Sequence, residues 1–293
     1  MHQSVLKGYL LALLGVVILS PDALLIRLAG NDPWAISLWR GLIGGGMVLV
    51  YNQWLDRRPL REQIRPAGHW FYTSTLIYAA AQFSFIYAIT HANVTDVLVI
   101  VAFTPLLSAL LSAVFLHERV LPRTWIATVI CGVGLAVLFS QAGSQSEPQG
   151  LAAAVVCAVL MAAQFVVIRS CPDANLTATI GFGSILSGLV VMSMTGLVWM
   201  GQAQFMAVLA MALIVGPIPF VLFTLSLRSI TAAETSLIML LESVLGSWLV
   251  WLFLAEQPSL QTMAAGILIL STLSVYGLLA LRDGRNAPAG QSS

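Results

Sequence analysis

Charged side chains interrupt three apolar stretches of this sequence. Asp22 follows Pro21 in ILSPDALLIRLAG, Arg40 lies in SLWRG, and Glu242 lies in IMLLESVLG. A charge at the centre of a lipid bilayer costs about 2.5–3.5 kcal/mol on insertion scales, and such residues usually face a partner or a water-filled cavity. These three residues are therefore the first candidates for binding a substrate or carrying a proton.

Asp22 and Arg40 lie nine residues before and nine residues after residue 31, the middle of a short connection. In an antiparallel helical hairpin, with a rise of about 1.5 Å per residue, they are expected at similar depth. Opposite charges at one depth can pair, which lowers the cost of insertion. Two interpretations remain open. The pair is purely structural, or Asp22 exchanges Arg40 for a proton or a cationic substrate group.

Glu242 is the strongest single candidate, because it lies nine residues after residue 233, where an apolar stretch begins. That position predicts a carboxyl group near the middle of the membrane. One interpretation is a buried, protonated glutamic acid that is bonded to a neighbouring helix. The other is a carboxylate that binds substrate or couples transport to protons.

Aromatic and amide side chains recur at helical spacing in two other stretches. Tyr78, Gln82 and Phe85 stand at i, i+4 and i+7, on one face of a predicted helix, and Gln164 precedes Phe165 in another. Rings together with amide groups could hold an amino acid or another amphiphile. Ordinary helix packing is the alternative interpretation.

Prolines predict interruptions in three helices, at Pro21, Pro105 and Pro217. Proline removes one backbone hydrogen bond and bends or opens a helix. The carbonyl group that loses its partner is tolerated at membrane depth where it lines a cavity. We therefore expect these three prolines to mark the walls of a cavity.

The sequence shows no catalytic, cofactor-binding or metal-binding pattern. Cys131, Cys157 and Cys171 lack the spacing of a metal or redox site, and there is no glycine-rich phosphate loop that ends in Gly-Lys-Ser/Thr. We therefore expect no enzyme, no cofactor, no metal and no ATP-driven motor.

The composition places these residues in a membrane. Of 293 residues, 59% are hydrophobic and 9% are charged, whereas soluble domains carry about a quarter charged residues. The net charge of +1 does not suggest a nucleic-acid partner. Since about 20 apolar residues cross a bilayer, ten spans are predicted. Their limits are 8–28, 34–55, 68–90, 94–116, 123–140, 150–169, 175–199, 204–226, 233–254 and 260–281.

Basic residues predict the orientation of these spans. With the N-terminus in the cytoplasm, all of the 13 lysines and arginines except Arg27 and Arg40 lie on the cytoplasmic side. An odd number of spans would remove this asymmetry. Both termini are therefore predicted to be cytoplasmic.

An internal repeat divides the chain into two halves. IVAFTPLLSALLSAVFLHERVLPRTWIA, from Ile100, aligns without gaps with IMLLESVLGSWLVWLFLAEQPSLQTMAA, from Ile238. Five helices per half is an odd number, so the second half must be inverted in the membrane, as in many secondary transporters. The predicted repeats are 1–141 and 150–282, and 283–293 is predicted to be a disordered cytoplasmic tail.

Glu118 and Glu256 occupy matching positions in FLHE and FLAE, where two predicted helices end. A carboxylate is unfavourable at a helix C-terminus but favourable at the N-terminus of the next helix. We expect both to be structural, each reaching the free N–H groups of the helix that follows.

These features, with SLWRG early in the second helix, resemble the EamA family of the drug/metabolite transporter superfamily. The resemblance covers nearly the whole chain. It implies a basket of ten helices in which helices 1, 3, 4, 6, 8 and 9 surround a central cavity. Helices 2 and 7 then pack outside, and helices 5 and 10 close one side. It also implies export of amino acids and other small metabolites across the bacterial inner membrane, most closely like the amino-acid exporters of the YddG type.

The predicted protein is thus an all-α, multi-pass transporter of the bacterial inner membrane. We expect it to export aromatic and other neutral amino acids by alternating access, as a monomer, with the lipid bilayer, a small-molecule substrate and protons as partners. Uncoupled facilitated diffusion agrees equally well with the sequence. The alternatives are an exporter of drugs or other metabolites, and a non-transporting membrane scaffold or sensor.

Overall fold

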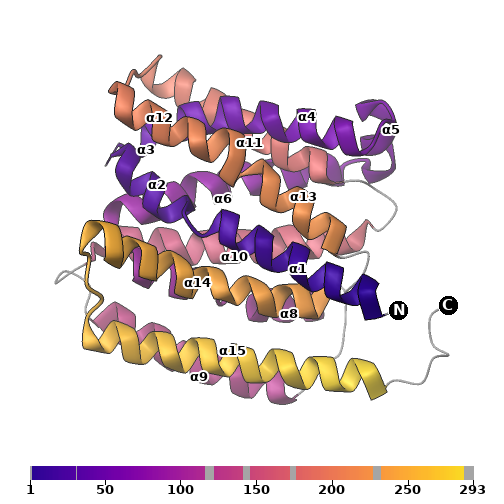
Figure 1. Cartoon of the computed structure of the whole chain (residues 1–293), viewed down its shortest axis with the longest axis vertical. Helices are drawn as coiled ribbons and strands as arrows, with labels where there is room; N and C mark the ends of the chain where they lie inside the picture. Colours follow the sequence, from indigo (N-terminus) through magenta and orange to yellow (C-terminus); the bar gives the residue numbers. More distant parts are fainter. Residues whose placement is uncertain are drawn as a thin grey trace.

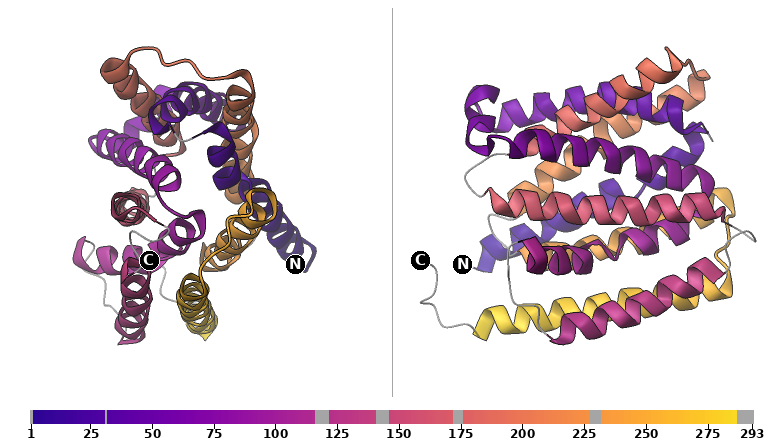
Figure 2. Two further views of the ribbon diagram at one scale, coloured as in Figure 1. Left: turned by 90° about the vertical axis from the view of Figure 1, so that its left-hand side faces the viewer. Right: turned by 180° about the vertical axis from the view of Figure 1, so that it is seen from behind.

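The structure is a computed structural model that describes residues 2–30, 32–115, 122–140, 146–171, 176–226 and 232–286. The regular secondary structure of these residues is helical, without strands. The helices lie side by side and run roughly parallel or antiparallel to one another (Figures 1 and 2). The first helix begins and the last helix ends on the same side of the bundle (Figure 1).

The helices of the first half extend from residue 2 to residue 140. They are α1 (His2–Leu19), α2 (Asp22–Ala29), α3 (Pro33–Trp39), the π-helix η1 (Arg40–Gly44), α4 (Gly45–Leu55), α5 (Leu60–Ile64), the 3₁₀-helix η2 (Arg65–Ala67), α6 (Trp70–His91), α7 (Val94–Val101), α8 (Thr104–Phe115) and α9 (Pro122–Ser140).

The helices of the second half extend from residue 148 to residue 286. They are α10 (Pro148–Ser170), α11 (Thr177–Thr195), α12 (Gln202–Ala210), the π-helix η3 (Met211–Val215), α13 (Pro217–Ser226), α14 (Ala232–Leu254) and α15 (Leu260–Asn286).

Each predicted span coincides with one or more of these helices, and seven stretches of the described residues are long and apolar enough to cross a membrane. The number ten and the cytoplasmic termini therefore stay predictions. The seven are Leu6–Ala29, Pro33–Leu55, Val94–Phe115, Pro148–Ile168, Thr177–Thr195, Gln202–Pro219 and Leu260–Leu279.

The predicted seventh span, 175–199, extends too far at its C-terminal end. The helix α11 stops at Thr195, because Gly196 follows with a φ of 74°. A glycine in this conformation ends helices readily, since it has no Cβ to clash. The next helix, α12, begins only at Gln202.

A helix boundary falls at each of the three predicted prolines. Pro21 separates α1 from α2, and Pro105 is the second residue of α8, which begins after the two-residue break that ends α7. Pro217 begins α13, and the preceding residue, Gly216, donates its N–H to the carbonyl of Met211 five residues back, at 2.8 Å. This wider turn belongs to η3 and accommodates a residue that has no N–H to donate.

Interruptions are not shared between the two halves. In the first half, α1–α2 is broken and α3–η1–α4 contains a π-helix, whereas their counterparts α10 and α11 are continuous. The pair α7–α8 is broken, whereas its counterpart α14 is continuous. The order is reversed for the remaining pair, in which α6 is continuous and α12–η3–α13 is interrupted. In the described residues, four repeat-related pairs therefore each contain one interrupted and one continuous member.

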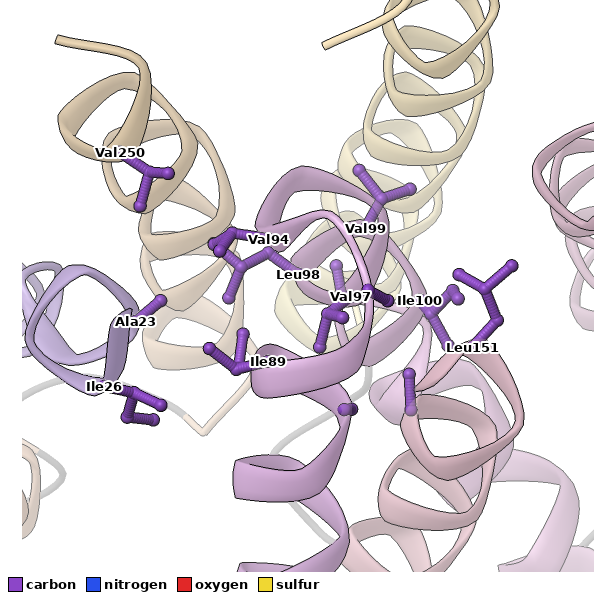
Figure 3. Packing of buried hydrophobic residues seen from close by; sticks show 14 of the residues in the cluster. Ala23, Ile26, Ile89, Val94, Val97, Leu98, Val99, Ile100, Leu151 and Val250 are labelled. Carbon is purple, nitrogen blue, oxygen red and sulfur yellow. The ribbon is translucent and has the colours of Figure 1, made fainter. Parts of the chain in front are cut away.

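A single large hydrophobic cluster joins the two halves. Figure 3 shows its centre, where side chains of α2, α6 and α7 meet side chains of α10 and α14. At one edge of the bundle α9 packs against α15, and at the opposite edge α4 packs against α11 (Figure 1). The residues labelled in Figure 3 are Ala23, Ile26, Ile89, Val94, Val97, Leu98, Val99, Ile100, Leu151 and Val250.

Glycines allow η1 and α4 to approach α11 closely. A Cβ atom added at Gly41 would lie 2.6 Å from the carbonyl oxygen of Ser184, and one added at Gly45 would lie 2.6 Å from that of Gly181. Small residues four positions apart are a common means of close helix packing in membranes. This contact fixes η1, and with it Arg40, against α11.

Gly45→Ala is therefore expected to lower the free energy of unfolding by about 1–3 kcal/mol, because the new methyl group meets backbone atoms that cannot move freely. Gly46→Ala is the matched control, since a Cβ there has no neighbour within 4 Å. Thermal unfolding of both variants in detergent micelles measures the difference. Equal stability of the two variants would contradict the close contact.

Candidate functional site

The predicted pair of Asp22 and Arg40 forms an ion pair in the structure. The distance from Arg40 Nη2 to Asp22 Oδ2 is 3.0 Å, and the side chains are 6% exposed for Asp22 and 16% for Arg40. Asp22 is the first residue of α2, so its carboxylate also lies at the positive end of that helix. The break at Pro21 creates this helix N-terminus in the middle of a predicted span.

The pair is incompletely satisfied. Asp22 Oδ1 is buried and has no hydrogen-bond partner among the described residues. The second terminal nitrogen of Arg40, Nη1, contacts Met211 Sδ at 3.8 Å, a weak acceptor. Arg40 and Met211 are the first residues of η1 and η3, which pack together. Short π-helices often occur at functional sites.

Glu242 lies within electrostatic reach of both Asp22 and Arg40. It is supplied by α14, whereas the other two residues come from α2 and η1, so the group of three charges combines both halves of the chain. With all three residues ionised the group would carry one net negative charge. It therefore favours an additional positive charge, either a proton or a cationic group of a ligand.

Tyr78 and Gln82 extend this polar group along α6. Tyr78 interacts electrostatically with Arg40 and Asp22 and lies near Ser184 of α11. Ser184 Oγ donates to Gln82 Oε1 at 2.7 Å, while Gln82 Nε2 is buried without a partner among the described residues. The structure thus brings five of the predicted residues into one neighbourhood.

The remaining predicted binding residues lie elsewhere. Gln164 Nε2 donates to Ser74 Oγ at 2.7 Å, and Ser74 precedes Gln82 by eight residues, or about 12 Å along α6. Phe85 packs against the large hydrophobic cluster. The structure does not bring these two residues into the central polar group, and their part in binding stays a prediction.

Two of the three predicted prolines lie next to elements of the central polar group. Pro21 immediately precedes Asp22, and Pro217 follows η3, which contacts Arg40 through Met211. The side chain of Pro105 is outside the described residues. Whether the three prolines line a cavity stays a prediction.

Glu256 binds a different partner from the predicted one. At the start of α15, Ser259 Oγ accepts from the N–H of Thr262 at 3.0 Å. Glu256 Oε1 lies 3.2 Å from Arg27 Nε, and Arg27 Nη2 also donates to the carbonyl of Ala92 at 2.7 Å. The arginine thus satisfies the Glu256 carboxylate, and Ser259 caps the first turn of α15 in its place. Glu118 lies outside the described residues.

Asp96 is a second buried carboxylate, but its contacts are structural. It accepts from Ser146 Oγ at 2.6 Å and from Thr262 Oγ1 at 2.8 Å. These bonds join α7 to Ser146, two residues before α10, and to the first turn of α15. In the part of the chain that the structure describes, no group of three or more His, Cys, Asp or Glu side chains could hold a metal ion.

Ser184 and Met211 were not found by sequence reasoning. The nearest signal for Ser184 is the small-residue run IGFGS, which is typical of close helix packing and says nothing about Gln82. Met211 lies in an apolar run and carries no polar signal. Both contacts join residues more than 100 positions apart.

Comparison with known families decides the class of protein. The model described as the EamA-like transporter family matches residues 6–140 and matches again at residues 148–278. The chain belongs to the EamA-like transporter family. This EamA chain is therefore a multi-pass membrane transporter of the drug/metabolite type, with two family repeats in an inverted-repeat architecture.

Solved structures support the fold of this EamA chain. Among 16 matching chains, one titled "Crystal structure of protein" is 22% identical with a TM-score of 0.62, and the match covers 96% of this chain and 99% of that chain. At this identity the likeness shows the fold alone. No curated protein matches the chain.

Removing one member of the central ion pair is expected to be costly, because the other charge then stays buried without a partner. Arg40→Gln should lower the free energy of unfolding by about 3–5 kcal/mol. The double variant Asp22→Asn/Arg40→Gln should lose less than the sum of the two single variants. Thermal unfolding in micelles of the wild type, the two single variants and the double variant measures these losses. If the loss in the double variant equals the sum of the single losses, the two residues do not interact directly.

Proposed function

We propose that this EamA transporter exports small zwitterionic metabolites, such as aromatic and other neutral amino acids, by alternating access. The observation that carries the proposal is the buried Asp22–Arg40 pair, in which one Asp22 oxygen has no partner among the described residues, together with Glu242 of the other half. We place the protein, as a monomer, in the bacterial inner membrane with both termini cytoplasmic.

A zwitterion matches this pair because it can replace each member with a group of the same charge. The ammonium group of an amino acid would bind Asp22, and its carboxylate would bind the planar guanidinium of Arg40. Every charge then stays paired during the exchange, which avoids the cost of an isolated buried charge. Tyr78 supplies an aromatic ring beside the pair for the substrate side chain.

Alternating access requires that contacts between the halves break at one end of the bundle. Arg27 of the first half binds Glu256 of the second half, with side-chain exposures of 16% and 29%. Arg27 also bonds to Ala92, the residue that ends α6. We infer that this ion pair closes one end of the transporter and opens when that end becomes accessible.

The net negative charge of the central group supports a second candidate, the export of cationic amphiphilic drugs. Such a substrate would satisfy Asp22 and Glu242 but would leave Arg40 without a new partner. Zwitterions satisfy both signs of charge and are therefore the first choice.

The proposal is tested by counterflow of labelled phenylalanine into liposomes that contain the purified protein, with and without a pH gradient. We expect saturable flux that Asp22→Asn and Arg40→Gln each abolish. If protons are coupled through Glu242, Glu242→Gln should transport without responding to the gradient. Flux of cationic amphiphiles in the absence of any amino-acid flux would favour the second candidate.

Reversal of the Arg27–Glu256 pair tests its role as a closing contact. Arg27→Glu and Glu256→Arg should each slow exchange several-fold, because like charges prevent that end from closing. The double variant should recover most of the rate. Asp56 and Arg58 form an exposed ion pair of 2.7 Å, and their reversal is the control that should leave exchange unchanged. Failure of the double variant to recover would contradict the proposed contact.

A further inference from the structure

A hydrogen bond between two buried side chains joins α6 to α11. Ser184 Oγ donates to Gln82 Oε1 at 2.7 Å. A serine hydroxyl has one proton to donate, and here the Gln82 carbonyl oxygen accepts it.

The direction of this bond determines which end of the Gln82 carboxamide is left without a partner. The carbonyl end accepts from Ser184, so the NH₂ end remains, with two donors and no acceptor among the described residues. Gln82 is 8% exposed. An unmade hydrogen bond at a buried donor is costly, so this NH₂ group is suited to a ligand that brings an acceptor.

The Ser184 backbone places this hydrogen bond beside the Asp22–Arg40 pair. The carbonyl oxygen of Ser184 lies 2.6 Å from the position that a Cβ of Gly41 would occupy, and Gly41 adjoins Arg40. Tyr78, one helical turn before Gln82, interacts electrostatically with both Arg40 and Asp22. Gln82 is thus hydrogen-bonded to Ser184, and the backbone of Ser184 packs against the residue that follows Arg40.

We propose that Ser184 is a positioning residue that fixes the Gln82 carboxamide with its NH₂ group available to the substrate. Together with Arg40, this NH₂ group makes the site selective for molecules that carry a carboxylate over amines that lack one. This inference rests on the proposed transport of zwitterions and identifies the residues that would set the preference. A site built to hydrogen-bond a substrate group rejects analogues that lack the group.

Competition between two ligands tests this role. Phenylalanine and phenethylamine share a ring and an ammonium group, and only phenylalanine has a carboxylate. Labelled phenylalanine enters liposomes by counterflow, and either unlabelled phenylalanine or phenethylamine is added as the competitor. The ratio of their half-inhibitory concentrations measures the preference for the carboxylate. We expect Ser184→Ala to reduce that ratio by about tenfold to a hundredfold, the range for a hydrogen bond to a charged group.

The change should arise from weaker binding of phenylalanine, with phenethylamine binding unchanged. Ser184→Thr keeps the hydroxyl and should retain the wild-type ratio. Ser187→Ala is the matched control on the same helix, because Ser187 is buried and its hydroxyl has no partner among the described residues. Gln82→Glu replaces the donor end with an acceptor and should reduce the ratio at least as much as Ser184→Ala. Thermal unfolding of each variant accompanies the assay.

The outcomes separate this inference from the proposed function. If the wild-type protein exchanges phenylalanine but Ser184→Ala keeps its ratio, the positioning role is wrong and the transport proposal stands. Equal weakening of both ligands would show that Ser184 is only structural, which also overturns the role. If the wild-type protein exchanges no phenylalanine, the proposed function fails and this inference fails with it.

Discussion

The requirement that a charge inside a bilayer be compensated governs the centre of this transporter. Asp22 and Arg40 meet this requirement together, at 3.0 Å. The meeting depends on irregular backbone, because Pro21 breaks the first span next to Asp22 and a π-helix begins at Arg40. The local irregularities and the ion pair are thus parts of one arrangement. A uniform helix in either span would not supply the same helix N-terminus or the same turn.

Close packing extends this arrangement to α11. Gly41 of η1 and Gly45 of α4 let the backbone of α11 approach closely, and Ser184 of α11 then orients Gln82 of α6. The central group consequently draws on helices from both halves, with Glu242 from α14. Inverted repeats commonly hold substrate between their halves, near the middle of the membrane. The polar residues here follow that plan without a separate binding domain.

Much of this organisation was predictable where the signal is local or symmetric. Equal spacing about a short connection predicted the Asp22–Arg40 pair, and proline chemistry predicted the helix boundaries. Contacts between distant segments were not predictable, because runs of apolar and small residues do not indicate which residues of two packed helices face each other. Ser184 meets Gln82 across 102 positions. Glu256 was assigned to the neighbouring helix, although its partner, Arg27, lies 229 positions away.

Two halves that share a repeat are usually expected to move alike, but the backbone of this chain implies that equivalent helices bend differently. Four repeat-related pairs each combine one interrupted member with one continuous member. A helix can bend at a proline or at a π-helix, while its regular counterpart resists bending. The two halves therefore differ in stiffness at equivalent positions. In each of the four pairs, one helix can bend and the helix related to it by the repeat stays straight.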